Sequence, residues 1–328
     1  MAQIVAGFAT SFSPQLHVSP DLWAAMGERD KGSAHLVGPD GQDHSYDDLV
    51  KMAGPGVAKA IEPAEAAARH GRSQQHIATI GKMLRDTALD ALVVFTDDEN
   101  YLFSEHMRPS CMLYFGGTVP YLPRTVAESA PPATKAAAWA YGTEAAEFPG
   151  QEALGEHIMW HFSQKAQITI AHSRYLLEGQ SIGHPFGFTN TRLLEGKQVP
   201  LIPVIFNASY PPNVPTSKRF YEIGQAIAEA VSTFEGNLRV GVLAVGGFSH
   251  PVIDEEMDRK VLDAIAAKDT ATLHALPRNR FQGANGQSLV WLAAAGALAN
   301  KQMNLLEYIP CYRSAGGTGC GMAFAHWS

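Results

Sequence analysis

The sequence is poor in cysteine, in positive charge and in long hydrophobic runs. It has only three cysteines, Cys111, Cys311 and Cys320, and none belongs to a CxxC pair, so it indicates neither a disulfide framework nor a zinc knuckle. Its net charge of −7 argues against a general nucleic-acid binder, which needs a basic face. Its longest apolar runs have only the length of a strand, so no membrane span is expected.

Several common catalytic and nucleotide-binding motifs are also missing. The glycine-rich run at 316–319 is not followed by the Lys-Ser/Thr pair of a P-loop, and no GxGxxG motif is present. The absence of GxSxG weakens an α/β-hydrolase interpretation, and the absence of HExxH removes one common zinc site. The first residues lack the basic and long apolar regions of a signal peptide. Together with the few cysteines, this favours a reducing, cytoplasmic setting.

Apolar segments of strand length alternate with amphipathic segments of helix length along all 328 residues. This alternation predicts an α/β fold in which helices flank a central mixed β-sheet. No repeat or linker is visible, so we expect a single domain over 1–328, with 28–62 as a surface excursion. The expected strands cover 3–12, 89–98, 110–117, 167–173, 199–209 and 238–247. The expected helices cover 45–53, 63–87, 152–166, 216–234, 254–267 and 286–301, and loops are expected at 13–23 and 124–137.

Some of these elements carry local signals that define their limits or their place in the sheet. Ser45 is suited to cap the helix that follows it, and Pro63 suits the first turn of the next helix. Thr216 or Ser217 is suited to cap the helix at 216–234. The prolines of the strand at 199–209 favour an edge position or a bulged end, because proline cannot donate to a ladder.

Histidines occur in two of the loops that follow predicted strands. His250 comes after Gly246-Gly247 and before an acidic helix start, which suits either a structural group or a general acid/base. His184 lies beside Phe186 and suits a planar aromatic ligand, although a lone loop histidine is more often structural. Catalytic groups gather at strand ends in α/β folds, so both histidines are candidates.

Two further groups of polar residues are candidates for ligand binding. Asp98 and Glu99 lie in an acidic run directly after a buried strand, where they could cap the loop or contact a metal or substrate. Tyr312 and Arg313 precede the glycine-rich turn near the carboxyl terminus, and the guanidinium of Arg313 could clamp a carboxylate.

The order of several motifs resembles one known family. The segments "RVGVLAVGGFSHPVIDEEMD", "GHPFGF", "VIFNASYPPNVPTSKRF", "LVWLAAAGAL" and "IPCYRSAGGTGCGMAF" resemble the class III extradiol dioxygenases, the family of the protocatechuate 4,5-dioxygenase β subunit (LigB-like). The resemblance covers nearly the whole chain and is most specific from 179 to 324. It implies an α/β fold around a mixed sheet, a dimer, and Fe(II) held by two histidines and one glutamate.

The family's functional residues match this sequence unevenly. The resemblance aligns His250 with the family's proton-transferring histidine and His184 with its substrate-contacting histidine. Phe12 replaces the first histidine ligand, Asp98 or Glu99 the second, and Gln287 the glutamate. Phenylalanine cannot bind a metal, and a neutral amide is a poor ligand for Fe(II), so the resemblance implies that the iron site is lost.

Three functions remain open at this stage. We favour a metal-independent acid/base enzyme, with no cofactor, that acts on a small phenolic or catechol-derived acid or a ring-cleavage acid. Tautomerisation, hydrolysis, decarboxylation and C–C lysis would all suit it. One alternative is an Fe(II) ring-cleavage dioxygenase with ligands relocated to His17, Glu99 and His106, and another is a non-catalytic subunit of a dioxygenase complex. The expected oligomer is a homodimer. The predicted catalytic residues are His250 and His184; the predicted substrate-binding residues are Phe12, His17, Asp98, Glu99, Phe186, Gln287, Tyr312 and Arg313.

Overall fold

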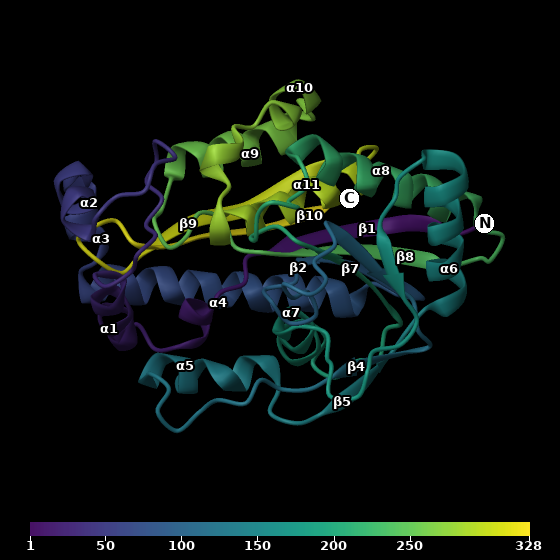
Figure 1. Cartoon of the computed structure of the whole chain (residues 1–328), viewed down its shortest axis with the longest axis horizontal. Helices are drawn as coiled ribbons and strands as arrows, with labels where there is room; N and C mark the ends of the chain where they lie inside the picture. Colours follow the sequence, from purple (N-terminus) through teal and green to yellow (C-terminus); the bar gives the residue numbers. More distant parts are fainter.

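The protein is built on one large mixed sheet with helices on both faces, as a computed structural model of all 328 residues shows (Figure 1). This confirms the predicted α/β fold. The strands are β1 (Gln3–Thr10), β2 (Ala91–Asp97), β3 (Cys111–Tyr114), β4 (Thr118–Tyr121), β5 (Ala146–Pro149), β6 (Ala171–Ser173), β7 (Leu201–Phe206), β8 (Arg239–Val245), β9 (Met303–Tyr312) and β10 (Gly319–Trp327). The large sheet has the strand order β6-β3-β7-β2-β8-β1-β10-β9, and β4 and β5 pair separately.

Eleven α-helices connect and cover these strands. They are α1 (Asp21–Asp30), α2 (Tyr46–Met52), α3 (Pro55–Ala60), α4 (Pro63–Asp86), α5 (Pro132–Ala137), α6 (Glu152–His161), α7 (His184–Phe188), α8 (Ser217–Thr233), α9 (Glu255–Ala267), α10 (Thr270–His274) and α11 (Val290–Ala297). None of them is both long enough and apolar enough to cross a membrane. A 3₁₀ turn at Gly283–Leu289 leads into α11.

The four central strands of the sheet run parallel to one another. β8 pairs in parallel with both β1 and β2, and β2 pairs in parallel with β7. β10 and β9 extend one side as antiparallel strands, and β3 begins an antiparallel extension on the other side. The carboxyl ends of β1, β8, β2 and β7 therefore meet at one edge of the sheet.

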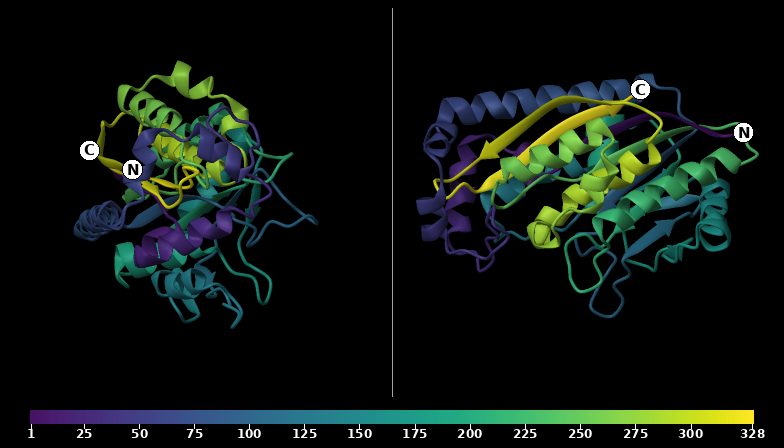
Figure 2. Two further views of the ribbon diagram at one scale, coloured as in Figure 1. Left: turned by 90° about the vertical axis from the view of Figure 1, so that its left-hand side faces the viewer. Right: turned by 90° about the horizontal axis from the view of Figure 1, so that it is seen from above.

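Two layers of helices bury the two faces of this sheet (Figures 1 and 2). Along β2, Val93 and Phe95 belong to the apolar cluster formed with α8, α9 and α11. Leu92 and Val94 belong to the cluster formed with α4, which runs along the opposite face. Every residue of β2 is buried, because its side chains alternate between two covered faces.

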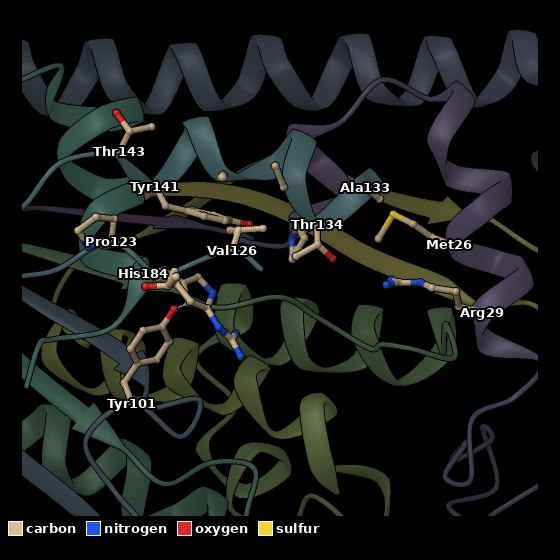
Figure 3. A pocket seen from close by; sticks show the side chains of 16 residues that line it. Met26, Arg29, Tyr101, Pro123, Val126, Ala133, Thr134, Tyr141, Thr143 and His184 are labelled. Carbon is tan, nitrogen blue, oxygen red and sulfur yellow. Dashed lines mark hydrogen bonds between the residues drawn. The ribbon is translucent and has the colours of Figure 1, made fainter. Parts of the chain in front are cut away.

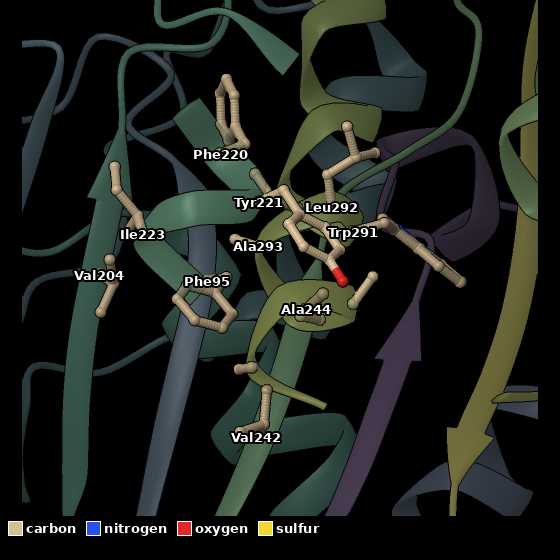
Figure 4. Close-up of a cluster of buried hydrophobic side chains, with 14 of the residues drawn as sticks. Phe95, Val204, Phe220, Tyr221, Ile223, Val242, Ala244, Trp291, Leu292 and Ala293 are labelled. Atoms are coloured by element: carbon tan, nitrogen blue, oxygen red, sulfur yellow. The ribbon is translucent and has the colours of Figure 1, made fainter. Parts of the chain in front are cut away.

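Helices α8 and α11 approach each other unusually closely on the first face (Figure 4). A Cβ added to Gly224 of α8 would lie 1.9 Å from the carbonyl oxygen of Ala293 in α11. A Cβ added to Gly296 of α11 would lie 2.1 Å from the carbonyl oxygen of Tyr221 in α8. The two glycines thus set the spacing between the helices, and the helices shield Trp291 and the centre of the sheet.

The local helix signals are confirmed. Ser45 accepts a hydrogen bond from the backbone of Asp48 and caps α2, and Pro63 begins α4. Thr216 caps α8 through the backbone N–H of Arg219. Each signal satisfies or removes a backbone donor that the first helical turn cannot pair internally.

The position predicted for the proline-containing strand was wrong. β7 lies inside the sheet, between β3 and β2, and not at an edge. Pro203 pairs with Val94 of β2, while the pairing with β3 reaches only as far as Val204. The missing donor of Pro203 is tolerated because the ladder between β7 and β3 stops one residue before it.

The two segments expected to be loops contain helical structure. Residues 13–23 include a 3₁₀ turn at Pro14–His17 and the start of α1, and 124–137 includes α5. Prolines made both segments resemble loops, but proline is also accepted in the first turn of a helix. Within 28–62, Leu36 and Leu49 are buried against Val252, so this segment packs beside the loop that carries His250.

A buried carboxyl group anchors that loop to α9. Asp258 accepts hydrogen bonds from the hydroxyl of Ser249 (2.6 Å) and from the hydroxyl of Tyr308 (2.7 Å). Burial raises the pKa of Asp258 from 3.8 to about 7, although these hydrogen bonds oppose the shift. The loop before His250 is thereby tied to both α9 and β9.

Substitution of either helix-contact glycine will destabilise the fold. We expect Gly224→Ala to lower the free energy of unfolding by about 3 kcal/mol, because the new methyl group forces two packed helices apart. Gly71→Ala is the control, since a Cβ there meets nothing within 4 Å in helix α4. The free energy of unfolding of the control should rise by about 0.5–1 kcal/mol, because alanine favours the helix more than glycine does. Urea unfolding measures both, and equal stabilities would contradict the close helix contact.

The anchor at Asp258 predicts a pH dependence of stability. Its raised pKa means that the folded protein binds a proton that the unfolded chain has released, so stability falls as pH rises from about 4 to about 7. One such group contributes a slope of up to about 1.4 kcal/mol per pH unit. Asp258→Asn should make the pH dependence in urea unfolding shallower, whereas Asp263→Asn, on the exposed side of the same helix, should not. If the free energy of unfolding depended on pH with the same slope in the natural protein and in both variants, the raised pKa of Asp258 would be contradicted.

Candidate functional site

Five of the residues predicted from the sequence converge on the edge where the parallel strands end. Phe12 follows β1, Glu99 follows β2, and His250 follows β8. His184 arrives at the same edge as the first residue of α7, and Gln287 lies on the 3₁₀ turn before α11. Parallel strands place their carboxyl-end loops together, so residues far apart in the sequence come to share one site.

Two neighbouring cavities open at this edge. The apolar cavity has a volume of about 440 Å³ and ends at His184 and Tyr101, with Met26 and Arg29 at its other end (Figure 3). The polar cavity has a volume of about 540 Å³ and is lined by Glu99 and Gln287, among others. Tyr101 and Arg124 line both cavities, so the two spaces meet at these side chains.

Glu99 is held in place from both sides. One carboxylate oxygen lies 2.9 Å from Nε2 of His184, and the other accepts a hydrogen bond of 3.0 Å from the amide of Gln287. Burial alone would raise the pKa of Glu99, but the contact with His184, followed by smaller contributions from His250 and Arg124, holds the pKa below its ordinary value. Glu99 is therefore an ionised carboxylate in a largely buried position.

Both ring nitrogens of His184 contact a polar side chain. Nε2 faces Glu99, and Nδ1 forms a short hydrogen bond with the hydroxyl of Tyr101. We call Glu99, His184 and Tyr101 the triad. The ring of His184 is packed against two aromatic rings, with centroid distances of 4.7 Å to Phe12 and 4.9 Å to Tyr141. This packing fixes the imidazole plane between its two hydrogen-bond partners.

His17 lies in the same aromatic cluster, but its hydrogen-bond partner is Arg192 and not a member of the triad. Its Nδ1 is 3.2 Å from the guanidinium of Arg192, which can only donate, so this nitrogen accepts. Burial, followed by the charge of Arg192, holds the pKa of His17 well below its ordinary value. His17 is a neutral histidine that orients Arg192, with a ring 5.3 Å from that of Tyr141.

His250 is positioned by the backbone around it. Its Nδ1 donates to the carbonyl oxygen of Phe248 at 2.6 Å, and its backbone N–H donates to the side chain of Asn285 at 2.7 Å. A carbonyl oxygen can only accept, so Nδ1 carries the hydrogen and Nε2 is free to accept a proton. Burial lowers the pKa of His250, while the nearby charge of Glu99 opposes the shift. His250 lies beside the turn that lines the polar cavity but is not part of either cavity's lining.

Four of the predicted substrate-binding residues have partners elsewhere. Both carboxylate oxygens of Asp98 accept from backbone amides, those of Leu102 and Phe103, at 2.9 Å. The Tyr312 hydroxyl donates to Glu255, and Arg313 forms a two-point ion pair with Asp30. Phe186 is fully enclosed in the apolar core. None of these four side chains lines either cavity.

The structure adds three residues that the sequence reasoning missed. Tyr101 belongs to the strand-end loop that contains Glu99, so its place in the sequence was a usable signal. Arg124 lies in a segment expected to be a loop, and Tyr141 follows in a 3₁₀ turn. The hydroxyl of Tyr141 is buried without a hydrogen-bond partner, although the residue lines the apolar cavity. No sequence motif marks Arg124 or Tyr141.

The side chains present do not fit an iron site with three protein ligands. Phe12 offers no ligand atom, and the carboxylate of Glu99 is already shared between His184 and the Gln287 amide. His106 lines a different surface cavity together with His172, and His17 faces Arg192, so the relocated set of His17, Glu99 and His106 is not brought together. No group of three His, Cys, Asp or Glu side chains is placed to hold a metal ion.

Comparisons with known proteins agree with this architecture. Residues 54–323 match the family described as the catalytic LigB subunit of aromatic ring-opening dioxygenase. Gallate dioxygenase of Pseudomonas putida is 29% identical over 97 residues, which represent 26% of this chain and 28% of that protein. The chain thus aligns with less than a third of the length of this relative. Because the family match covers most of the sequence, the chain belongs to the LigB family of aromatic ring-opening dioxygenases.

Proposed function

We propose that this protein carries out acid–base chemistry, without iron, on a phenolic or catechol-derived acid or on an acid formed by opening such a ring. The observation that carries the proposal is the triad of Glu99, His184 and Tyr101, which lies where the two cavities meet. A buried carboxylate that orients a histidine, which in turn contacts a hydroxyl, is an arrangement suited to moving a proton. Tautomerisation, hydrolysis, decarboxylation and C–C bond cleavage all require such a transfer.

His250 is proposed as a second acid–base group. Its Nδ1–H is fixed to the carbonyl of Phe248, which leaves Nε2 as the proton acceptor. Burial favours the neutral ring, and the carboxylate of Glu99 would stabilise the charge after a proton is accepted. Its position beside the polar cavity supports a role on the opposite side of the ligand from His184.

The cavities favour an anionic aromatic ligand. Arg29 and Arg124 line the apolar cavity, and neither takes part in the salt bridges of the protein. Apolar walls suit a ring, and a guanidinium without a carboxylate partner suits the acid group of a ligand. Arg124 lies at the junction of the cavities, so a carboxylate held there would bring the attached ring to Tyr101.

Ring opening with iron and O₂ is the second candidate, because the family match supports it. The donor set at Phe12, Glu99 and Gln287 favours the metal-independent proposal instead. A homodimer and a cytoplasmic location are further proposals, which rest on the family resemblance and on the few cysteines. A non-catalytic role beside an active homologue would be indicated by a failure to turn over any candidate acid.

Iron content tests the metal-independent proposal directly. Protein purified without a histidine tag is incubated anaerobically with Fe(II), separated from free metal and assayed for iron per chain. We expect far less than one iron per chain, because Phe12 and Gln287 cannot complete a ligand set. A variant with Phe12→His, Glu99→His and Gln287→Glu restores the donor types of the family and should bind more iron. Stoichiometric iron in the natural protein would contradict the proposal.

Arg124 is expected to bind the carboxylate of the ligand. Gallate, the compound that gives the relative its name, serves as an aromatic-acid probe in calorimetric titrations. Arg124→Gln should weaken binding about tenfold, or about 1.4 kcal/mol, because one charge-assisted contact is lost. Lys218→Gln removes a charge from the remote helix α8 and should leave the affinity unchanged. Equal affinities of the natural protein and the Arg124 variant would place the carboxylate elsewhere.

A further inference from the structure

The direction of the hydrogen bond between His184 and Tyr101 depends on the charge of the imidazole. Nε2 of His184 faces the ionised carboxylate of Glu99, which can only accept, so Nε2 carries a hydrogen. When the ring is neutral, Nδ1 has a lone pair and accepts from the hydroxyl of Tyr101. When the ring is protonated, Nδ1–H donates to the phenolic oxygen, and the phenolic hydrogen is free to point into the cavities.

Tyr101 is the member of the triad that a ligand can approach from both cavities. His184 lines only the apolar cavity and Glu99 only the polar cavity, whereas Tyr101 lines both. His184 is further shielded by the rings of Phe12 and Tyr141. A proton that passes between the ligand and His184 can therefore travel through the phenolic oxygen. Burial raises the pKa of Tyr101, so the phenol does not remain ionised between steps.

We propose that Tyr101 is the catalytic residue that exchanges a proton with the substrate, and that the site interconverts the enol and keto forms of a carboxylic acid. This inference rests on the proposed function and specifies its reaction. His184 stores the proton, and Glu99 balances the charge of the imidazolium. The sequence of contacts from Glu99 through His184 to Tyr101 resembles a carboxylate–histidine–hydroxyl arrangement in which the hydroxyl meets the substrate.

The reaction balances without any oxidant, reductant or co-reactant. In the first step the enol O–H gives its proton to the oxygen of Tyr101 while the phenolic hydrogen moves to Nδ1 of His184. The O–H electron pair stays on the substrate, which becomes an enolate. In the second step Nδ1–H returns to the phenolic oxygen, and the phenolic hydrogen forms a C–H bond with the electron pair of the enolate π system. One proton has moved from oxygen to carbon.

Arg124 indicates which enols fit the site. It lines both cavities beside Tyr101, and its charge also lowers the pKa of Glu99. A carboxylate bound by Arg124 would place a conjugated enol next to the phenolic oxygen. A guanidinium near the developing enolate would also stabilise its negative charge. The substrate class is therefore a 2-hydroxydienoic acid, an enol conjugated to its own carboxylate.

The test uses the full-length protein, a 2-hydroxydienoic acid as probe and a metal chelator in every assay. Loss of the conjugated enol is followed by its ultraviolet absorbance, and deuterium incorporation at carbon is measured by NMR in D₂O. Tyr101→Phe should lower kcat by about 10²-fold or more, with KM changed by less than about threefold, because the variant keeps the ring and loses only the proton. Tyr114→Phe is the matched control. It removes a buried hydroxyl that bonds Thr118 away from the cavities, and its kcat should be unchanged.

The outcomes separate this inference from the proposed function. If the natural protein is active and Tyr101→Phe is equally active, Tyr101 is not the proton-transferring residue, although acid–base chemistry stands. If the natural protein does not exchange the proton of the probe, the keto–enol assignment is wrong. Stoichiometric iron binding would, by contrast, contradict the proposed function itself. Should Tyr101→Phe fail to fold, Glu99→Gln tests the same route, because a neutral amide cannot balance the imidazolium and should lower kcat at least about tenfold.

Discussion

The parallel alignment of β1, β8, β2 and β7 is the constraint on which the site depends. Four strands that run in the same direction must end at the same edge, and their connecting loops are then forced into one neighbourhood. The strands are buried on both faces toward their carboxyl ends, so these residues are committed to the core and the loops that follow are available for chemistry. The close contact of α8 with α11 supports this arrangement, since α11 begins where the turn carrying Gln287 ends.

Phe12, Glu99 and Gln287 contact one another's neighbours through protein groups alone. Glu99 accepts from Gln287, whereas a second carboxylate at that position would place two like charges within about 3 Å. The other oxygen of the Glu99 carboxylate is 2.9 Å from Nε2 of His184, so both carboxylate oxygens have a protein partner. Phe12 packs its ring on the imidazole of His184, with the two ring centroids 4.7 Å apart.

Much of the fold could be predicted from the sequence because its signals are local. The continuous apolar run at 89–98 predicted a buried strand, observed at Ala91–Asp97. Ser45, Pro63 and the pair Thr216 and Ser217 predicted where helices begin. The predictions failed where the same local residue pattern is compatible with two different structures. Prolines in 13–23 and 124–137 suit loops and also first helical turns, and Pro203 can lie inside a sheet when the adjacent strand is short.

The sequence alone determined the α/β architecture, the family and the importance of two histidines, of which His250 follows a strand and His184 begins helix α7. It could not distinguish Asp98 from Glu99, because neighbouring acids look equivalent until the backbone turns. The structure commits Asp98 to two backbone amides and turns Glu99 towards His184. It also gives Arg313 a partner in Asp30 and leaves Arg124 at the cavities. Side-chain partnerships between residues distant in sequence depend on how loops pack across the sheet edge, and that packing is decided only in the tertiary structure.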